Sequence, residues 1–413
     1  MRKAFVIVYI LFVCAFNFLP KSVDTGLFLI FVLGSAGYVE LHRNQFRTLY
    51  GKDPTTQKLR RLFTLFLCVS AIYLLLSFFN LPRIWGIQNL LFSHSYIPRH
   101  FIIVAELFLP VLLADAIYKL RLFNWLKTPY LILFFLLVFF GVHALCVIGV
   151  LLVTLALISW KCDKKILLLP AFFLNHHQSA YVMGFLVLML LLCFERPVAR
   201  YLYKNTLRKI VIFTLLAIIC VFLLSSVLAF YIEEDANSLW RLQVWGNEIR
   251  SLAQTCFTGV GFGSAYVTED IVDLVDNANM YFKNTEGALE AGVFVVANHS
   301  SLLNMFYRMG LIGGGLFLFI NIQIIRIIVK FYRKGNRRER ALLWRLFAVW
   351  MYQTVVIFLN PGLEMMQFAV SYLPCLSCLL AAILAIRDRP RPYEQMNPLP
   401  ENNHGYPCTS SLN

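Results

Sequence analysis

Residues 129–160, PYLILFFLLVFFGVHALCVIGVLLVTLALISW, show how this chain is built, because they contain no Asp, Glu, Lys or Arg. Basic residues flank this apolar run on both sides, at Lys127 and between Lys161 and Lys165. In membrane proteins, short loops rich in Lys and Arg mark the cytoplasmic side. A run with cytoplasmic flanks at both ends cannot be a single crossing. We therefore predict two short helices that turn back on each other near residues 141–146.

The composition of the whole chain agrees with a membrane protein. Hydrophobic residues make up 59% of the 413 residues and charged residues 14%, whereas soluble domains carry roughly 25% charged residues. Apolar runs recur with about the 20 residues that a membrane-spanning helix needs, and a β-barrel would show alternating segments of about 10 residues instead. The net charge of +15 lies in short loops between apolar runs, a pattern that indicates membrane topology and disfavours nucleic-acid binding.

The same rule predicts a second hairpin over residues 166–194, because basic residues follow it from Arg196 to Lys209. Its polar break is Asn175-His176-His177-Gln178-Ser179, which is therefore expected at or near the outer face. Polar residues are costly within lipid and are often functional there.

These segments together predict an all-α polytopic membrane protein with about twelve transmembrane helices and both termini in the cytoplasm. The long hydrophilic segment 231–303 is more acidic than basic and is predicted to lie outside, between helices nine and ten. Helices one to nine then occupy 1–230, helices ten to twelve occupy 304–386, and 387–413 form a disordered cytoplasmic tail. Outside the two hairpins, helices are expected at about 4–19, 25–40, 62–80, 101–118, 210–230, 309–329, 346–360 and 366–386, with the most basic loop at 330–345.

Candidate chemistry gathers on the outer segment. Arg241 and Trp245 are four residues apart on an amphipathic helix that is expected to begin near residue 238, so they share a face. The run Gly259-Val260-Gly261-Phe262-Gly263 is expected to form a turn. It is not a phosphate-binding loop, because no Gly-Lys-Ser/Thr follows it. His299 is expected at the membrane surface, where the next helix re-enters the bilayer.

The order of these elements resembles the conserved region of the bacterial O-antigen ligase and O-antigen polymerase family. That region has Arg-x3-Trp, a G-x-G-x-G turn, and a His before a membrane helix with G-x2-G, here Gly310 and Gly313. The resemblance covers residues 238–316 directly. It implies a glycosyltransferase C-type membrane fold in the inner membrane with a large periplasmic loop. It also implies undecaprenyl-diphosphate-linked oligosaccharide donors, with no cofactor and no metal.

The resemblance also suggests roles for individual residues. Arg241 and Arg308 would hold the diphosphate, because arginine offers a fixed charge and a planar fork of donors to the departing group. His299 would act on the acceptor hydroxyl or assist the phosphate, since histidine titrates near neutrality. Further candidates for substrate binding are His176, His177, Arg83, Arg99 and Trp245.

Two departures from the family pattern favour a polymerase of O-antigen or exopolysaccharide repeat units over a ligase that transfers glycan to lipid A core. Ligases carry an arginine at the outer tip of the hairpin before helix nine, and residues 175–181 contain none. Ligases also usually have Asn after the histidine, where this chain has Ser300. The expected partners are the lipid-linked donor, the bilayer, a glycan or lipid A core acceptor and a chain-length regulator, with no nucleic acid.

Simpler interpretations stay open at this point. Arg308 could extend to lipid headgroups, Ser300 or Ser301 could merely cap the helix that follows, and the glycines could serve close packing alone. A lipid-linked sugar transporter or flippase is the main alternative function, but it would gather charges or broken helices at the middle of the membrane. A structural scaffold would leave Arg241 and His299 unexplained.

Overall fold

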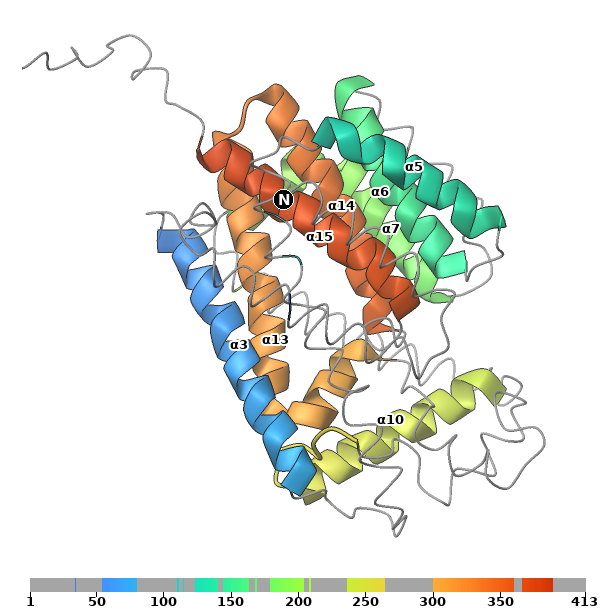
Figure 1. Ribbon diagram of the computed structural model, residues 1–413, viewed down its shortest axis with the longest axis vertical. Coiled ribbons are helices and arrows are strands. Elements are labelled where there is room, and N and C mark those ends of the chain that lie inside the picture. The colour runs from blue at the N-terminus through green and yellow to red at the C-terminus, as the bar shows by residue number, and fades with distance from the viewer. Residues whose placement is uncertain are drawn as a thin grey trace, which may run out of the picture.

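The computed structural model describes residues 54–79, 123–139, 144–162, 179–203, 236–263, 300–359 and 366–388, together with the single residues 34, 110, 114, 168 and 208. The regular secondary structure of this part is helical throughout, without strands, in agreement with the predicted all-α class. The helices shown in Figure 1 are α3 (Pro54–Phe79), α5 (Phe123–Phe139), α6 (Ala144–Cys162), α7 (Ser179–Cys193), α8 (Glu195–Tyr203), α10 (Ala236–Gln254), α13 (Ser301–Lys334), α14 (Arg337–Phe358) and α15 (Met366–Arg387).

The hairpin predicted over 129–160 is confirmed. Helices α5 and α6 are joined by the short segment 140–143 and pack against each other. Leu152 and Ala156 of α6 are fully buried, whereas Ile132 and Phe135 of α5 are exposed. Of the second predicted hairpin, α7 forms the returning arm, and most of the first arm lies outside the described residues.

Helix α14 lies at the centre of the packed bundle, where it contacts α6, α7, α13 and α15 (Figure 1). Its Trp344 and Trp350 side chains are fully buried. Buried hydroxyl groups within the bundle donate hydrogen bonds to carbonyls one turn back, as in Thr154 to Val150 at 2.8 Å. This local bonding satisfies polar groups that the apolar surroundings would otherwise penalise.

The prediction of a loop over residues 330–345 is wrong, because helix α13 continues to Lys334 and α14 begins at Arg337. The basic residues therefore lie mostly on helices. Asn336 explains the early start of α14, since its side chain accepts a hydrogen bond from the amide of Glu339 at 2.9 Å. The Glu339 carboxylate in turn accepts from the Asn336 amide at 2.7 Å, which completes a capping box.

Two other helix starts also differ from the sequence-based expectation. Helix α3 begins at Pro54 instead of near residue 62, and proline suits a first helical position because its missing N–H has no partner to lose there. Helix α13 begins at Ser301, and its cap is Ser300, one of the two residues proposed for that role from the sequence. The predicted start near 309 instead coincides with a break, where Gly310 has φ 62° and ψ −164°.

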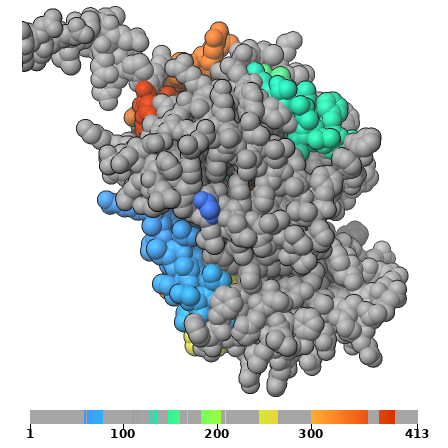
Figure 2. Space-filling model, viewed as in Figure 1, coloured from blue at the N-terminus to red at the C-terminus, as the bar shows by residue number. Residues whose placement is uncertain are grey.

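Two described helices, α13 and α14, are long and apolar enough to cross a membrane. Helices α3 and α5 lie at the surface in Figure 2, in blue and teal. The exposed large apolar side chains on α3, α5 and α7 include Leu65, Ile72, Leu75, Leu76, Leu131, Ile132, Phe135, Leu136, Val138, Met183, Leu186 and Leu190. The spans predicted at 4–19, 25–40, 101–118 and 210–230 fall almost wholly outside the described residues.

Candidate functional site

The expected glycine turn is present and follows α10 directly. Gly259, Gly261 and Gly263 all have positive φ angles, of 88°, 80° and 86°. Cys256 and Phe257 just before them also have positive φ, at 49° and 60°. Non-glycine residues rarely adopt this conformation, so the surrounding structure must hold the segment in place.

The turn is held by the break in helix α13. In an unbroken helix the amide of Leu311 would bond to the carbonyl of Tyr307. Here that amide donates to the carbonyl of Phe257 at 3.0 Å, and the carbonyl of Tyr307 accepts from Val260 at 2.8 Å. The turn therefore satisfies backbone groups that the break in α13 would otherwise leave without partners. We call residues 255–263 together with the break at Gly310 the glycine junction.

The junction leaves no room for side chains at two of its glycines. A Cβ atom on Gly259 would lie 2.4 Å from the amide nitrogen of Gly310. A Cβ atom on Gly310 would lie 2.4 Å from the carbonyl oxygen of Phe257. Close backbone approach, together with positive φ, explains why glycine is needed at both positions.

Helix α3 completes the junction from the other side. The amide of Phe262 donates to the Ser77 hydroxyl oxygen at 2.8 Å, and the Tyr73 hydroxyl donates to the carbonyl of Thr258. Figure 1 shows the C-terminal ends of α3 and α10 lying close together. Three helices that are distant in the sequence therefore share one turn.

Arg308 lies inside the junction and is fully buried. Its Nη1 donates to the carbonyl of Gly261 at 3.2 Å. Glu248 of α10 is also fully buried and carries the opposite charge. The guanidinium is therefore enclosed by protein, which contradicts the simpler interpretation that Arg308 extends to lipid headgroups. Its predicted contact with a diphosphate stays a prediction.

The other predicted site residues are placed only in part. Arg241 and Trp245 both lie on α10, as expected, and Trp245 is partly buried, but the side chain of Arg241 falls outside the described part of the structure. His299 is outside it too, although it directly precedes Ser300. The Ser300 hydroxyl caps α13 and donates to the carbonyl of Phe358 at 2.9 Å. The remaining candidates, His176, His177, Arg83 and Arg99, also lie outside the described residues.

Glu248, Ser77 and Tyr73 were not among the site residues predicted from the sequence. For Glu248 a signal was available, because positions 241, 245 and 248 follow the spacing of one helix face. Ser77 and Tyr73 gave no such signal, since their partners lie far along the chain. Within the described ranges, no group of three or more His, Cys, Asp or Glu side chains could hold a metal ion.

No protein-family model matches the chain, and no curated protein matches it either.

Proposed function

We propose that this chain is a polytopic inner-membrane glycosyltransferase that acts on undecaprenyl-diphosphate-linked oligosaccharides at the periplasmic face. Its reaction would polymerise repeat units of O-antigen or exopolysaccharide. The proposal rests on the resemblance of residues 238–316 to the ligase and polymerase family, together with two features of the described structure.

The first feature supports the membrane part of the proposal. Leu65, Ile72 and Leu76 on α3 are each about half exposed, and α5 and α7 carry similar outward apolar faces. A soluble protein rarely exposes contiguous apolar surface on this scale. In a bilayer, these faces would contact lipid, while α13 and α14 would cross it inside the bundle.

The second feature carries the glycosyl-transfer part. The resemblance covers three segments: helix α10, the glycine turn and helix α13. These segments are joined by direct contacts, since the turn after α10 bonds to both sides of the break in α13. The helix that carries position 241 and the helix that directly follows position 299 are therefore joined through this junction. Catalysis needs reacting groups to be held in fixed geometry, and this junction supplies a scaffold for Arg241 and His299.

The proposed reaction uses that scaffold in a single transfer step. An acceptor hydroxyl attacks the anomeric carbon of the donor sugar, and the bond from that carbon to the diphosphate oxygen breaks. His299 accepts the proton of the hydroxyl. Arg241 stabilises the negative charge that develops on the leaving undecaprenyl diphosphate. Buried Arg308 acts in this scheme as a positioning residue, because its guanidinium holds the turn through the carbonyl of Gly261.

The test is an assay with purified full-length protein in liposomes that contain the lipid-linked donor. Arg241→Ala and His299→Ala are each expected to lower the rate of undecaprenyl diphosphate release by at least about 100-fold, in line with the loss of a charge-stabilising or acid–base group. Arg250→Ala is the matched control, because Arg250 is exposed on the same helix. Full activity in both site variants would exclude the proposed chemistry.

The product distinguishes the proposed polymerase from its alternatives. In cells, loss of a polymerase leaves single repeat units on lipid A core, whereas loss of a ligase leaves long chains on the carrier lipid. A flippase would move the donor across the liposome membrane without releasing undecaprenyl diphosphate. Long chains on the carrier lipid would show that the chain is a ligase. Movement of the donor without release of undecaprenyl diphosphate would show that it is not a transferase.

A further inference from the structure

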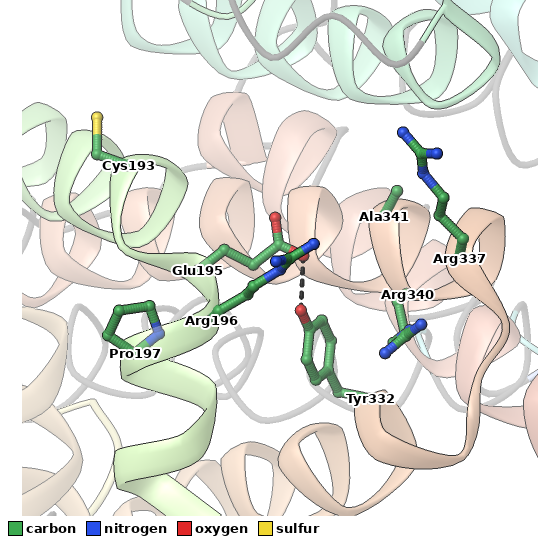
Figure 3. A pocket seen from close by; sticks show the side chains of 8 residues that line it. All are labelled: Cys193, Glu195, Arg196, Pro197, Tyr332, Arg337, Arg340 and Ala341. Atoms are coloured by element: carbon green, nitrogen blue, oxygen red, sulfur yellow. Dashed lines mark hydrogen bonds between the residues drawn. The ribbon is translucent and has the colours of Figure 1, made fainter.

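A cavity of about 880 Å³ lies at the far end of α13 from the glycine junction. Figure 3 shows it between the start of α8, the end of α13 and the start of α14. Its lining residues are Cys193, Glu195, Arg196, Pro197, Tyr332, Arg337, Arg340 and Ala341. None of these residues belongs to the site proposed for glycosyl transfer.

The charge of the cavity is positive. Three arginines line it against the single carboxylate of Glu195, which accepts a hydrogen bond from the Tyr332 hydroxyl at 2.7 Å. Arg196 from α8 and Arg340 from α14 lie beside Tyr332 in Figure 3. Both are exposed, and no ion pair with a described residue holds either guanidinium. Two exposed guanidinium groups over an open cavity are suited to a phosphate group, which accepts several charge-assisted hydrogen bonds.

The floor of the cavity is rigid. The Tyr332 side chain is buried, and its ring packs on Trp344 with centroids 5.0 Å apart. Trp344 is fixed in turn, because its indole N–H donates to the carbonyl of Leu191 at 2.7 Å. The ends of α7, α13 and α14 are thereby tied together beneath the arginines.

An apolar stripe leads along α7 to the rim of the cavity. Met183, Leu186, Leu190 and Phe194 are all exposed and follow the spacing of one helix face. Phe194 directly follows the lining residue Cys193. A polar phosphate in the cavity and an acyl chain along this stripe would match both surfaces at once, which a soluble phosphate compound or an acidic peptide would not.

If α13 crosses a membrane as proposed, its length would put the cavity at one membrane surface. From Leu311, just after the break, to Tyr332 the helix rises about 30 Å at 1.5 Å per residue. That is about the thickness of the hydrocarbon core. If the glycine junction lies at the periplasmic face, the cavity lies at the cytoplasmic headgroup level, where basic pockets between helices bind anionic lipids.

We propose that this cavity binds the phosphate headgroup of an anionic membrane lipid, with Arg196 and Arg340 as the principal ligands and the α7 stripe as the seat of an acyl chain. The proposal depends on the membrane placement given above and not on glycosyl transfer. A protein that fails the transferase assay can therefore still pass this test.

Cys193 provides a native probe, because it lines the cavity and its thiol is free and exposed. The full-length protein is placed in nanodiscs of phosphatidylcholine with or without phosphatidylglycerol, and maleimide modification of Cys193 is followed by peptide mass spectrometry. Phosphatidylglycerol is expected to slow the modification on the order of tenfold. Cys256, which lies at the other end of α13 in the glycine junction, is the internal control and should react at the same rate in both nanodiscs.

Matched variants test the two ligands. Arg196→Gln with Arg340→Gln should abolish the protection of Cys193, whereas Arg196→Lys with Arg340→Lys should retain most of it. Arg338→Gln removes an exposed arginine of α14 that does not line the cavity, and it should change nothing. An unchanged melting temperature in phosphatidylcholine verifies that the variants are folded.

Three results would overturn the proposal. Equal protection of Cys193 in the wild type and in the double Gln variant would show that Arg196 and Arg340 do not bind the lipid phosphate. Protection by soluble glycerol phosphate as effective as that by phosphatidylglycerol would identify a free phosphate compound as the ligand. Protection by a polyglutamate peptide in the absence of any effect of phosphatidylglycerol would identify an acidic protein segment.

Discussion

Arg308 and Gly261 bond to each other in both directions. The amide of Gly261 donates to the carbonyl of Arg308 at 3.0 Å, and the Arg308 guanidinium donates from Nη1 to the carbonyl of Gly261 at 3.2 Å. The turn after α10 and the break in α13 are therefore linked by main chain and side chain at the same residue. Movement of α10 relative to α13 must break both bonds.

Arg308→Met is expected to lower the free energy of unfolding by about 3–5 kcal/mol, since it leaves the buried charge of Glu248 without compensation. Glu248→Gln should also destabilise the protein, because it leaves the buried charge of Arg308 without compensation. The measurement is chemical unfolding of the purified protein in detergent, followed by tryptophan fluorescence.

The double variant Arg308→Met with Glu248→Gln distinguishes a charge interaction from two independent packing effects. If the charges interact, the double variant should be clearly more stable than the sum of the single losses predicts. Additive losses would show that Glu248 and Arg308 act separately.

Gly310→Ala should destabilise the protein by at least about 1–3 kcal/mol, because the backbone at this position lies in a region that is essentially limited to glycine. The added Cβ would also meet the carbonyl oxygen of Phe257 at 2.4 Å. Gly315→Ala is the control in the same helix, since no atom lies within 4 Å of its added Cβ. That change should stabilise the protein by about 0.5–1 kcal/mol. Equal melting temperatures for the two variants would contradict the described break in α13.

Ser77→Ala is expected to cost about 1–3 kcal/mol, because it leaves the buried amide of Phe262 without its acceptor. Ser70→Ala is the comparison on the same helix. The Ser70 hydroxyl donates to the carbonyl of Phe66 at 2.6 Å, a group that also accepts within the helix, so its loss should cost less than about 1 kcal/mol. Similar losses in thermal unfolding of the two variants would show that α3 does not hold the turn through Ser77.

Features governed by local sequence were predictable from the chain alone. The hairpin at 129–160 follows from its length and its basic flanks, and the turn at 259–263 follows from its glycines. A hydroxyl residue before an apolar run predicted Ser300 or Ser301 as a helix cap, and Ser300 is the residue that caps α13. Each of these signals depends only on neighbouring residues.

Features governed by tertiary partners were not predictable. Gly310, Gly313, Gly314 and Gly315 look equivalent in the sequence, but the helix breaks at Gly310, where the turn at 257–260 bonds to the helix. Arg345 was expected in a cytoplasmic loop, but it is buried and donates to the carbonyl of Ser159. The early start of α14 is an intermediate case, because Asn336 and Glu339 have the spacing of a capping box.

The sidedness of α13 can be tested with two native cysteines. Cys256 is exposed in the glycine junction, and Cys193 is exposed beside the basic cavity. If α13 crosses the membrane in the proposed orientation, a membrane-impermeant maleimide added to intact spheroplasts should modify Cys256 and spare Cys193. Permeabilisation should then expose Cys193. Cys68 is exposed on the apolar face of α3, where lipid should keep a charged reagent away in both conditions.

Peptide mass spectrometry is needed for the readout, because the chain has 10 cysteines. Modification of both Cys256 and Cys193 from the same side would mean that the segment between the junction and the cavity does not cross the bilayer. Modification of Cys193 alone in intact spheroplasts would show that the topology is the reverse of the proposed one, with the glycine junction on the cytoplasmic side. An inverted topology would also remove the basis for periplasmic chemistry at Arg241 and His299, because the lipid-linked donor would then meet the other face of the protein.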